Sequence, residues 1–211
     1  MEIIWFDTLT STQETLVEGL KKFTFTPPVC VGTSVQTDGR GSRGNGWIGC
    51  EGNLFISVAL LRSELPGDLR LESSSIYLAF LMKELLASMG SDVWLKWPND
   101  FYIGEKKIGG VITTLSGETL VCGIGINLVS APDDFSIIDI AVSAYDLTKA
   151  YSELFENLPS WKQIFSKYQL EFEHSRVFFT HNNYEKIALK DALLLEDGSL
   201  ECDGQRIYSL R

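Results

Sequence analysis

Residues 39–47, GRGSRGNGW, decide how the rest of this chain is interpreted. Glycine lets backbone N–H groups approach a ligand closely, and the two arginines can neutralise a phosphate or carboxylate with paired hydrogen bonds. The stretch therefore predicts a loop that folds over an anion. A glycine-rich surface loop with solvated arginines is the alternative, and the loop taken alone leaves both interpretations open.

Length and composition indicate one main domain with, at most, a small appendix. The chain has 211 residues, of which 45% are hydrophobic and 22% charged, as in an ordinary globular protein. Eighteen basic and 28 acidic residues give a formal net charge of −10. This charge repels a polyphosphate backbone over the surface as a whole, so we expect no general binding of nucleic acid.

Several other functional classes are also disfavoured. The N-terminus lacks the pattern of a signal peptide, and the apolar runs are shorter than the roughly 20 residues that a membrane span needs. The four cysteines form no Cys-x-x-Cys pair, which argues against a zinc site and favours reduced thiols in the cytoplasm. His174 and His181 lie near no candidate nucleophile, so a histidine-based triad is not expected.

The glycine-rich loop joins two predicted strands, 29–35 and 53–61. A strand at 3–6 and a helix starting near Ser11 precede them. Further along, 73–75 can cap a core helix that ends at Gly90, and residues 93–97 form a strand that stops at Pro98. This pattern predicts a mixed α/β (α+β) fold with a central mixed sheet flanked by helices.

The second half continues with a hairpin and then helices. Runs at 108–114 and 120–128 surround the turn Ser116-Gly117, Asp146 can cap a helix through residue 158, and Pro159-Ser160 can start another through residue 172. From about residue 177, short strand-like runs separate turn signals, which predicts a small β module.

The segment KWPND at 96–100 gathers a cation, an amide and a carboxylate around a proline where a strand ends. Strand ends are where open sheets place ligands. An ordinary turn, with Asn99 and Asp100 bonding to their own backbone, is the alternative that composition alone favours.

Two glycine-containing strands add to the pattern. Lys107 is followed by Gly109-Gly110, where small residues indicate close approach of a ligand or of another backbone. In GIGIN at 123–127 the glycines share one face of a pleated strand and the isoleucines the other. The glycine face can floor a pocket or pack tightly against a helix.

Together, in this order, the four segments and Ser11-Thr12 resemble the biotin protein ligase family over about residues 3–175. The resemblance implies a biotin and lipoate ligase-like catalytic domain, similar to class II aminoacyl-tRNA synthetases, at residues 1–175, and a small SH3-like β domain at 176–211. It implies activation of biotin with ATP and Mg²⁺ to biotinyl-5′-AMP, and transfer to one lysine of a biotin carboxyl carrier protein.

The resemblance also assigns residues. The proposed catalytic residues are Lys107 and Arg40, because fixed positive charge must stabilise two anions that repel each other. The positions implied for biotin are Ser11, Thr12, Gln13, Gln36, Gly39, Arg40, Gly41, Ser42, Lys107, Gly110 and Gly125. Those implied for ATP or the adenylate are Arg43, Trp47, Lys96, Asn99, Asp100 and Asn127.

Two departures from the family pattern carry expectations. Ser42 stands where members often have a further arginine, so we expect the reactive adenylate to leave more readily. Gln13 replaces a common asparagine, which keeps an amide but lengthens its reach.

Alternatives within and outside the fold remain. A lipoate or octanoate ligase or transferase is the first rival, and a noncatalytic biotin sensor is the second. We expect neither DNA binding nor membrane association, whereas a homodimer stays open.

Overall fold

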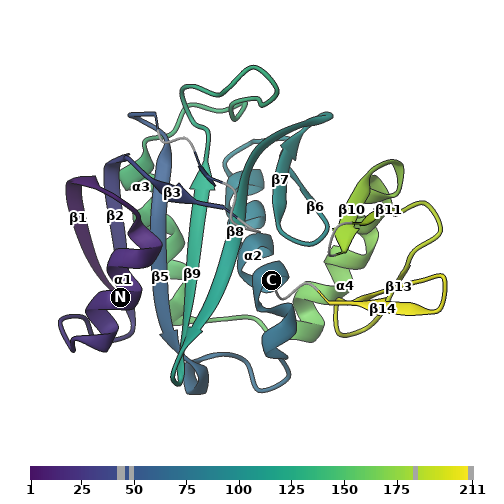
Figure 1. The fold of residues 1–211 in the computed structure, drawn as a ribbon, viewed down its shortest axis with the longest axis horizontal. Coiled ribbons are helices and arrows are strands. Elements are labelled where there is room, and N and C mark those ends of the chain that lie inside the picture. Colours follow the sequence, from purple (N-terminus) through teal and green to yellow (C-terminus); the bar gives the residue numbers. More distant parts are fainter. Residues whose placement is uncertain (42–45, 48–49, 183–184, 209–211) are drawn as a thin grey trace.

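The computed structural model describes residues 1–41, 46–47, 50–182 and 185–208. Among these residues, seven strands form a central sheet in the order β1-β2-β5-β9-β8-β7-β6 (Figure 1). The pair β1 and β2 is parallel and the remaining neighbours are antiparallel, so the predicted mixed sheet is confirmed. The strands are β1 (Glu2–Leu9), β2 (Val29–Gln36), β5 (Leu54–Leu61), β6 (Trp94–Lys96), β7 (Asp100–Ile103), β8 (Lys106–Ser116) and β9 (Thr119–Ile126).

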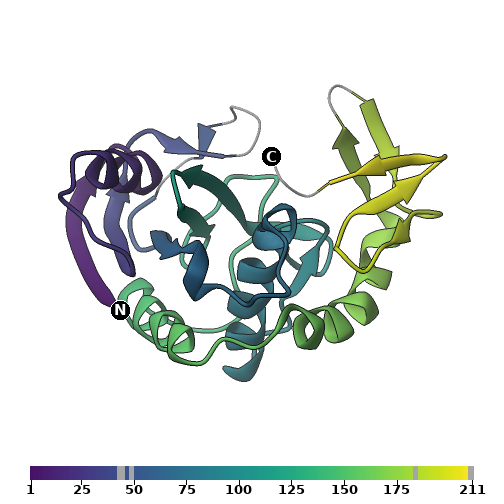
Figure 2. The ribbon, with the colours of Figure 1, turned by 90° about the horizontal axis from the view of Figure 1, so that it is seen from below.

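Helices cover both faces of the sheet. Helix α1 (Thr12–Lys21) packs on one face, where Leu16 meets Val29 and Val31 of β2. Cys30, between those valines, points to the opposite face and the larger core, as the period of two in a strand requires. That face carries α2 (Ser74–Ser88), α3 (Ala144–Glu153) and α4 (Trp161–Glu171), and Figure 2 shows α1 on the other side of the sheet from α3 and α4.

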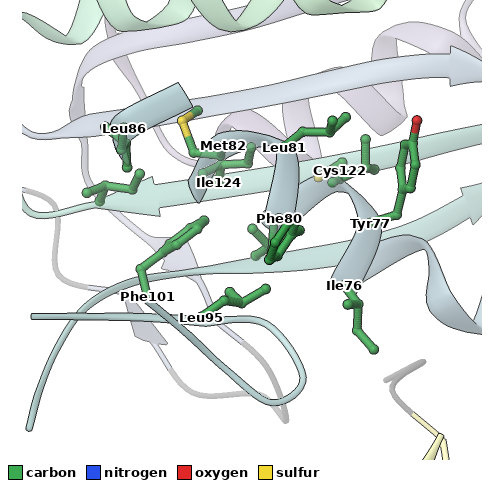
Figure 3. Close-up of a cluster of buried hydrophobic side chains, with 14 of the residues drawn as sticks. Ile76, Tyr77, Phe80, Leu81, Met82, Leu86, Leu95, Phe101, Cys122 and Ile124 are labelled. Carbon is green, nitrogen blue, oxygen red and sulfur yellow. The ribbon is translucent and has the colours of Figure 1, made fainter. Parts of the chain in front are cut away.

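Helix α2 is the centre of the main core. Figure 3 shows Phe80, Met82 and Leu86 of α2 gathered with Phe101 of β7 and Ile124 of β9. Each of the five is at most 3% exposed. Burial of such side chains contributes about 1.5–3 kcal/mol each, so the predicted role of this helix in core packing is confirmed.

Helix starts follow the sequence signals in two cases and depart from them in two. Ser11 caps α1 through Glu14 N, and Ser160 forms a capping box with Gln163 at α4. The prediction that Asp146 caps the next helix is wrong, because Ser143 accepts from Asp146 N and α3 ends at Glu153. A short 3-10 turn, η4 (Leu154–Glu156), follows it.

Ser73 precedes α2 but makes no side-chain cap. Its hydroxyl instead donates to the carbonyl of Asp197 in the C-terminal part of the chain. The prediction that a serine side chain caps α2 is therefore wrong, because the Ser73 hydroxyl donates to a distant carbonyl and accepts no hydrogen bond from the first turn of the helix.

Short strands make up the C-terminal part, as predicted. Gly198, Asp203 and Gly204 have positive φ angles, as expected for the turn signals read there. The C-terminal strands are β10 (Phe179–Asn182), β11 (Glu185–Ala188), β12 (Leu193–Leu194), β13 (Leu200–Cys202) and β14 (Gln205–Ile207). The remaining elements are β3 (Gly39–Arg40), β4 (Gly46–Trp47), η2 (Arg62–Glu64), η3 (Leu71–Ser73) and η5 (Phe172–Val177).

One contact joins these strands to the turn that precedes β7. The fully buried indole of Trp97 donates to the carbonyl of Gly198 at 2.9 Å, and Ser175 Oγ accepts from Trp97 N at 3.1 Å. The C-terminal part therefore supports the 96–100 turn directly. Every helix in the described ranges is too short or too polar to serve as a membrane span.

Candidate functional site

A cavity opens on the α1 face of the sheet, and we call it the ligand cavity. Its volume is about 480 Å³, including the open space at its mouth. It brings together most residues that the sequence predicted for the site, although they are widely separated along the chain. The described residues that line it are Ser11, Thr12, Gln13, Gln36, Arg40, Gly41, Trp47, Ile56, Asn99, Asp100, Lys107, Gly110, Val111, Ile112, Gly123, Ile124 and Gly125.

Three predicted residues in the described part of the chain, Gly39, Lys96 and Asn127, lie beside this lining rather than in it. Gly39 pairs with Trp47 between β3 and β4, and a Cβ on Gly39 would lie 2.3 Å from Gln36 Nε2. Ser42 and Arg43 lie outside the described residues.

One end of the cavity is polar and buried. The Gln36 amide oxygen accepts from Thr12 N at 2.9 Å and lies 3.3 Å from Thr12 Oγ1. Gln13 Nε2 donates to the carbonyl of Val121 at 3.4 Å. These three cavity side chains are each at most 7% exposed, so hydrogen bonds among neighbours fix their orientation before a ligand arrives.

The other end carries charge. Lys107 Nζ lies 2.6 Å from Asp100 Oδ1, and Lys96 Nζ lies 3.8 Å from Asp100 Oδ2. A Cβ on Gly110, opposite Asp100 in the β7–β8 pair, would lie 3.2 Å from Asp100 Oδ1. Glycine at this position leaves room for the ion pair.

A β-bulge aims Lys107 at the cavity. The register between β7 and β8 shifts between Phe101 and Tyr102, so that Phe101 pairs with Gly109 and Tyr102 with Lys107. Ile108 is consequently buried in the core, while Lys107 and Gly110 both line the cavity. Bulges re-aim side chains in this way beside functional sites.

Arg40 lies at the mouth. Its Nε donates to Glu14 Oε1 at 2.8 Å, and its Nη2 lies 3.5 Å from Asp38 Oδ2. The hydrogen bond with Glu14 raises the pKa of Arg40 further above its ordinary value, so the guanidinium stays charged. The side chain is 48% exposed, which leaves it free to exchange partners.

Asn99 faces its neighbouring strand. Its Nδ2 donates to the carbonyl of Val111, whose own N–H donates to Asn99 O at 2.9 Å. The 96–100 turn is therefore fixed to β8 by this exchange, rather than by Asn99 bonding to its own backbone.

The glycines of β9 floor the cavity. A Cβ on Gly123 would lie 2.6 Å from Gln13 Oε1, and a Cβ on Gly125 would lie 2.9 Å from Trp47 Nε1. Ile124 and Ile126 point into the core, as the period of two predicted. The indole nitrogen of Trp47 is buried and has no hydrogen-bond partner among the described residues, so a ligand acceptor can satisfy it.

A second hollow, which we call the aromatic cleft, adjoins the first at Trp47. The described residues that line it are Gly46, Trp47, Asn127, Pro132 and Phe135. The rings of Trp47 and Phe135 lie 6.2 Å apart at an interplanar angle of 85°. Such an apolar, aromatic hollow suits a flat ring system.

Asn127 closes the loop that carries Phe135. Its Nδ2 donates to Ser136 O at 3.2 Å, and its carbonyl accepts from Ile138 N at 2.9 Å. Ser136 N donates in turn to Lys107 O at 2.9 Å. The aromatic cleft is thus tied to the backbone of Lys107.

Several residues of the site were not predicted from the sequence. Ser57 is fully buried beneath Thr12 and Gln13, and the only signal for it was a single hydroxyl in an aliphatic strand. Phe135 lies in a stretch that carried no motif. Ile112 lines the cavity and was predicted only as a strand residue, and Ile56 and Val111, whose side chains belong to the core on the opposite face, lie at the cavity as part of the sheet beneath it.

Comparisons with known proteins agree on one family. Residues 5–128 match the model of the biotin/lipoate A/B protein ligase family. The chain is 31% identical over 148 residues to the bifunctional ligase/repressor BirA of Bacillus subtilis, covering 67% of this chain and 45% of that protein. It is 29% identical over 133 residues to a biotin–[acetyl-CoA-carboxylase] ligase of Mycobacterium tuberculosis, covering 58% and 50%. The chain thus spans about half the length of these relatives.

Solved structures give a fuller match. The biotin acetyl coenzyme A carboxylase synthetase from Helicobacter pylori, with bound biotinylated ATP, is similar with a TM-score of 0.93 and 42% identity. That match covers 98% of this chain and 99% of the other. The fold of the biotin protein ligase from Aquifex aeolicus, in complex with biotin and ATP, is similar at a TM-score of 0.75, 24% identity and coverage of 100% and 96%.

Proposed function

This chain belongs to the biotin/lipoate A/B protein ligase family, and we propose that it activates biotin with ATP and attaches it to a protein lysine. One observation carries the proposal. The ligand cavity joins a rigid polar end at Thr12 and Gln36 to a cationic end at Lys107 and Arg40, and it adjoins the aromatic cleft. This order of polar, charged and aromatic sites suits biotin, a phosphate and an adenine ring.

The first step forms biotinyl-5′-AMP. The carboxylate of biotin attacks the α-phosphate of ATP, and pyrophosphate leaves with the electrons of the broken P–O bond. Two anions must approach each other, so fixed positive charge stabilises the transition state. Lys107 supplies that charge in the proposal, because its Nζ lines the cavity and needs only to exchange Asp100 for the substrate.

The second step moves biotin to the acceptor. The lysine amine of a biotin carboxyl carrier domain attacks the acyl carbon, AMP leaves, and the amine loses a proton. Arg40 lies at the cavity mouth and would hold the phosphate of the adenylate during both steps. The reaction requires no covalent intermediate between biotin and this chain.

The remaining assignments follow the position of each residue. We assign biotin to Ser11, Thr12, Gln13, Gln36 and the glycine floor, which line the polar end. We assign Trp47 and Asn127, which line the aromatic cleft, to the adenosine. Asn99 and Asp100 line the ligand cavity and are assigned to the part of the adenylate that joins the biotin to the adenosine. Lys96 Nζ lies 3.8 Å from Asp100 Oδ2 and would act through that carboxylate. Ser42 and Arg43, which lie outside the described residues, stay assigned to biotin and to the nucleotide from the sequence alone.

Magnesium enters the proposal with the nucleotide. The described residues contain no group of three or more histidine, cysteine or acidic side chains that could hold a metal. Mg²⁺ commonly binds through phosphates and water with one or two carboxylates, and Asp100 is the carboxylate that lines the cavity. The ion would neutralise the charge of the departing pyrophosphate.

The proposal extends to the organisation of the chain. Residues 1–175 would be the catalytic domain and residues 176–211 a small β domain that supports the 96–100 turn. The reaction would take place in the cytoplasm, and it can proceed in a monomer or in a homodimer.

A single incubation tests the function. The protein is mixed with ATP, Mg²⁺, a biotin carboxyl carrier domain and either biotin or lipoate, and the carrier is analysed by intact mass. We expect a mass increase of one biotin and none with lipoate. Attachment of lipoate alone would identify a lipoate ligase, and biotin binding without pyrophosphate release would identify a sensor.

A further inference from the structure

We propose that Ser57 is a positioning residue that sets the orientation of the biotin-binding side chains. The inference rests on the proposed function, because it concerns the polar end of the same cavity. Ser57 itself is 0% exposed and lies beneath the cavity, so it would act through Thr12, Gln13 and Gln36.

Ser57 is fully buried in an otherwise apolar strand, where an apolar side chain is the usual choice. It lies in the middle of β5, whose sequence is LFISVALL, and its backbone neighbours across the sheet are Val31 and Gly123. A buried hydroxyl costs free energy unless it is hydrogen-bonded. Alanine or valine would suit the strand better, so the hydroxyl is explained by what it contacts.

The contacts form a short relay. Ser57 Oγ lies 2.9 Å from Thr12 Oγ1 and 3.2 Å from Gln13 Oε1. A hydroxyl donates one hydrogen and accepts others, whereas an amide oxygen only accepts. Ser57 therefore links two adjacent cavity side chains and can donate to either of them.

The relay continues to Gln36 with a fixed direction. Thr12 N can only donate, and it lies 2.9 Å from Gln36 Oε1, so that oxygen is held toward α1. Thr12 Oγ1 donates to the same oxygen at 3.3 Å and accepts from Ser57. The amide nitrogen of Gln36 is consequently turned away from Thr12, to where a Cβ on Gly39 would lie.

Gln13 is oriented from two sides. Its Nε2 donates to Val121 O at 3.4 Å, which leaves Oε1 facing Ser57. Gly123, the cross-strand partner of Ser57, provides the space, since a Cβ there would lie 2.6 Å from that oxygen. Without the Ser57 hydroxyl, Gln13 Oε1 and Thr12 Oγ1 would each lose this neighbour in a buried place.

The test compares Ser57→Ala with Thr113→Val in the full chain. Thr113 is also a buried hydroxyl residue of the sheet, but its Oγ1 has no partner among the described residues, so it controls for loss of a hydroxyl as such. Biotin affinity is measured by calorimetry without ATP, and KM is then measured for biotin and for ATP. We expect Ser57→Ala to raise the Kd and KM for biotin about tenfold, with the KM for ATP unchanged.

A second variant guards against a folding defect. Ser57→Cys keeps the side-chain size and a weak donor, so we expect a Kd for biotin between those of the wild type and Ser57→Ala. Equal biotin affinity in the wild type, Ser57→Ala and Ser57→Cys would overturn the inference. An equal rise in the KM for biotin and the KM for ATP in Ser57→Ala would overturn it as well. Wild-type protein that fails to bind biotin would instead overturn the proposed function, and the relay with it.

Discussion

The ammonium group of Lys107 lies 2.6 Å from the carboxylate of Asp100, across the paired strands β7 and β8. Both side chains are partly shielded, at 26% and 22% exposure, and Lys96 Nζ lies 3.8 Å from the other oxygen of the same carboxylate. Lys107 is thus held at the cavity wall before any substrate enters. In the proposed reaction Lys107 would exchange Asp100 for the negative charge that the biotin carboxylate and the α-phosphate bring together.

Lys107→Ala should abolish most adenylate formation. Removing a charge placed at the transition state costs about 3 kcal/mol, which is a rate loss of roughly a hundredfold. Lys106→Ala is the control, because Lys106 is the exposed neighbour on the same strand. The readout is biotin-dependent pyrophosphate release, and equal rates in the two variants would remove Lys107 from the catalytic site.

Arg40→Ala should weaken binding of the adenylate and leave the fold intact. The ion pair with Glu14 is exposed, and such pairs contribute about 0–1 kcal/mol to stability. The affinity for biotinyl-AMP should fall about tenfold, in keeping with loss of a charge-assisted hydrogen bond. Arg62→Ala, which breaks a comparably exposed pair with Glu118, should leave affinity unchanged. Fluorescence titration and thermal unfolding of both variants separate the two effects.

Trp97→Phe should destabilise the protein more than Trp94→Phe does. Trp97 is fully buried and its indole donates to Gly198 O, 101 positions away. The indole of Trp94 donates to Gly104 O, only 10 positions away in the turn after β7. Loss of the buried bond and ring volume should lower the free energy of unfolding by about 2 kcal/mol. Urea unfolding of the two variants checks this, and equal midpoints would contradict it.

Asp197 should contribute stability that is lost in acid. Burial tends to raise its pKa, but hydrogen bonds from Ser199 Oγ and N, together with Arg206, outweigh burial and hold the pKa below its ordinary value of 3.8. A lowered pKa in the folded state means that the unfolded chain binds the proton more readily. The contribution is therefore complete above pH 3.8 and disappears as the pH falls through the lower folded value.

The Asp197→Asn variant tests this sign. Its deficit in unfolding free energy, relative to the wild type, should shrink as the pH is lowered through that range. Asp7→Asn, at an exposed position on β1, controls for the substitution itself. A deficit that grows in acid would show that the carboxylate is not stabilising.

Local periodicity made part of the site predictable. Gly123 and Gly125 face the cavity and Ile124 and Ile126 the core, because alternation in a strand depends only on adjacent residues. The same rule fails at β8. It would place Lys107 and Gly110 on opposite faces, and only the bulge opposite Phe101 and Tyr102 brings them to one cavity.

Long-range partners account for the other differences. Ser73 looked like a cap from its neighbours, but Asp197 O takes its hydroxyl from 124 positions away. Ser57 and Phe135 became visible only when α1 and the segment after β9 were placed against the sheet. A sequence pattern shows the polarity of each residue, whereas a contact between residues far apart in the chain depends on how the helices and strands pack against one another.

The indole–carbonyl link between Trp97 and Gly198 has a consequence for biosynthesis. During synthesis, all strands of the central sheet, which end at Ile126, can leave the ribosome while Gly198 is still inside it. During that interval the turn bearing Asp100 lacks one of its supports. Full activity in the proposed reaction should accordingly appear only after Gly198 has emerged, well after the proposed biotin-binding surface has formed.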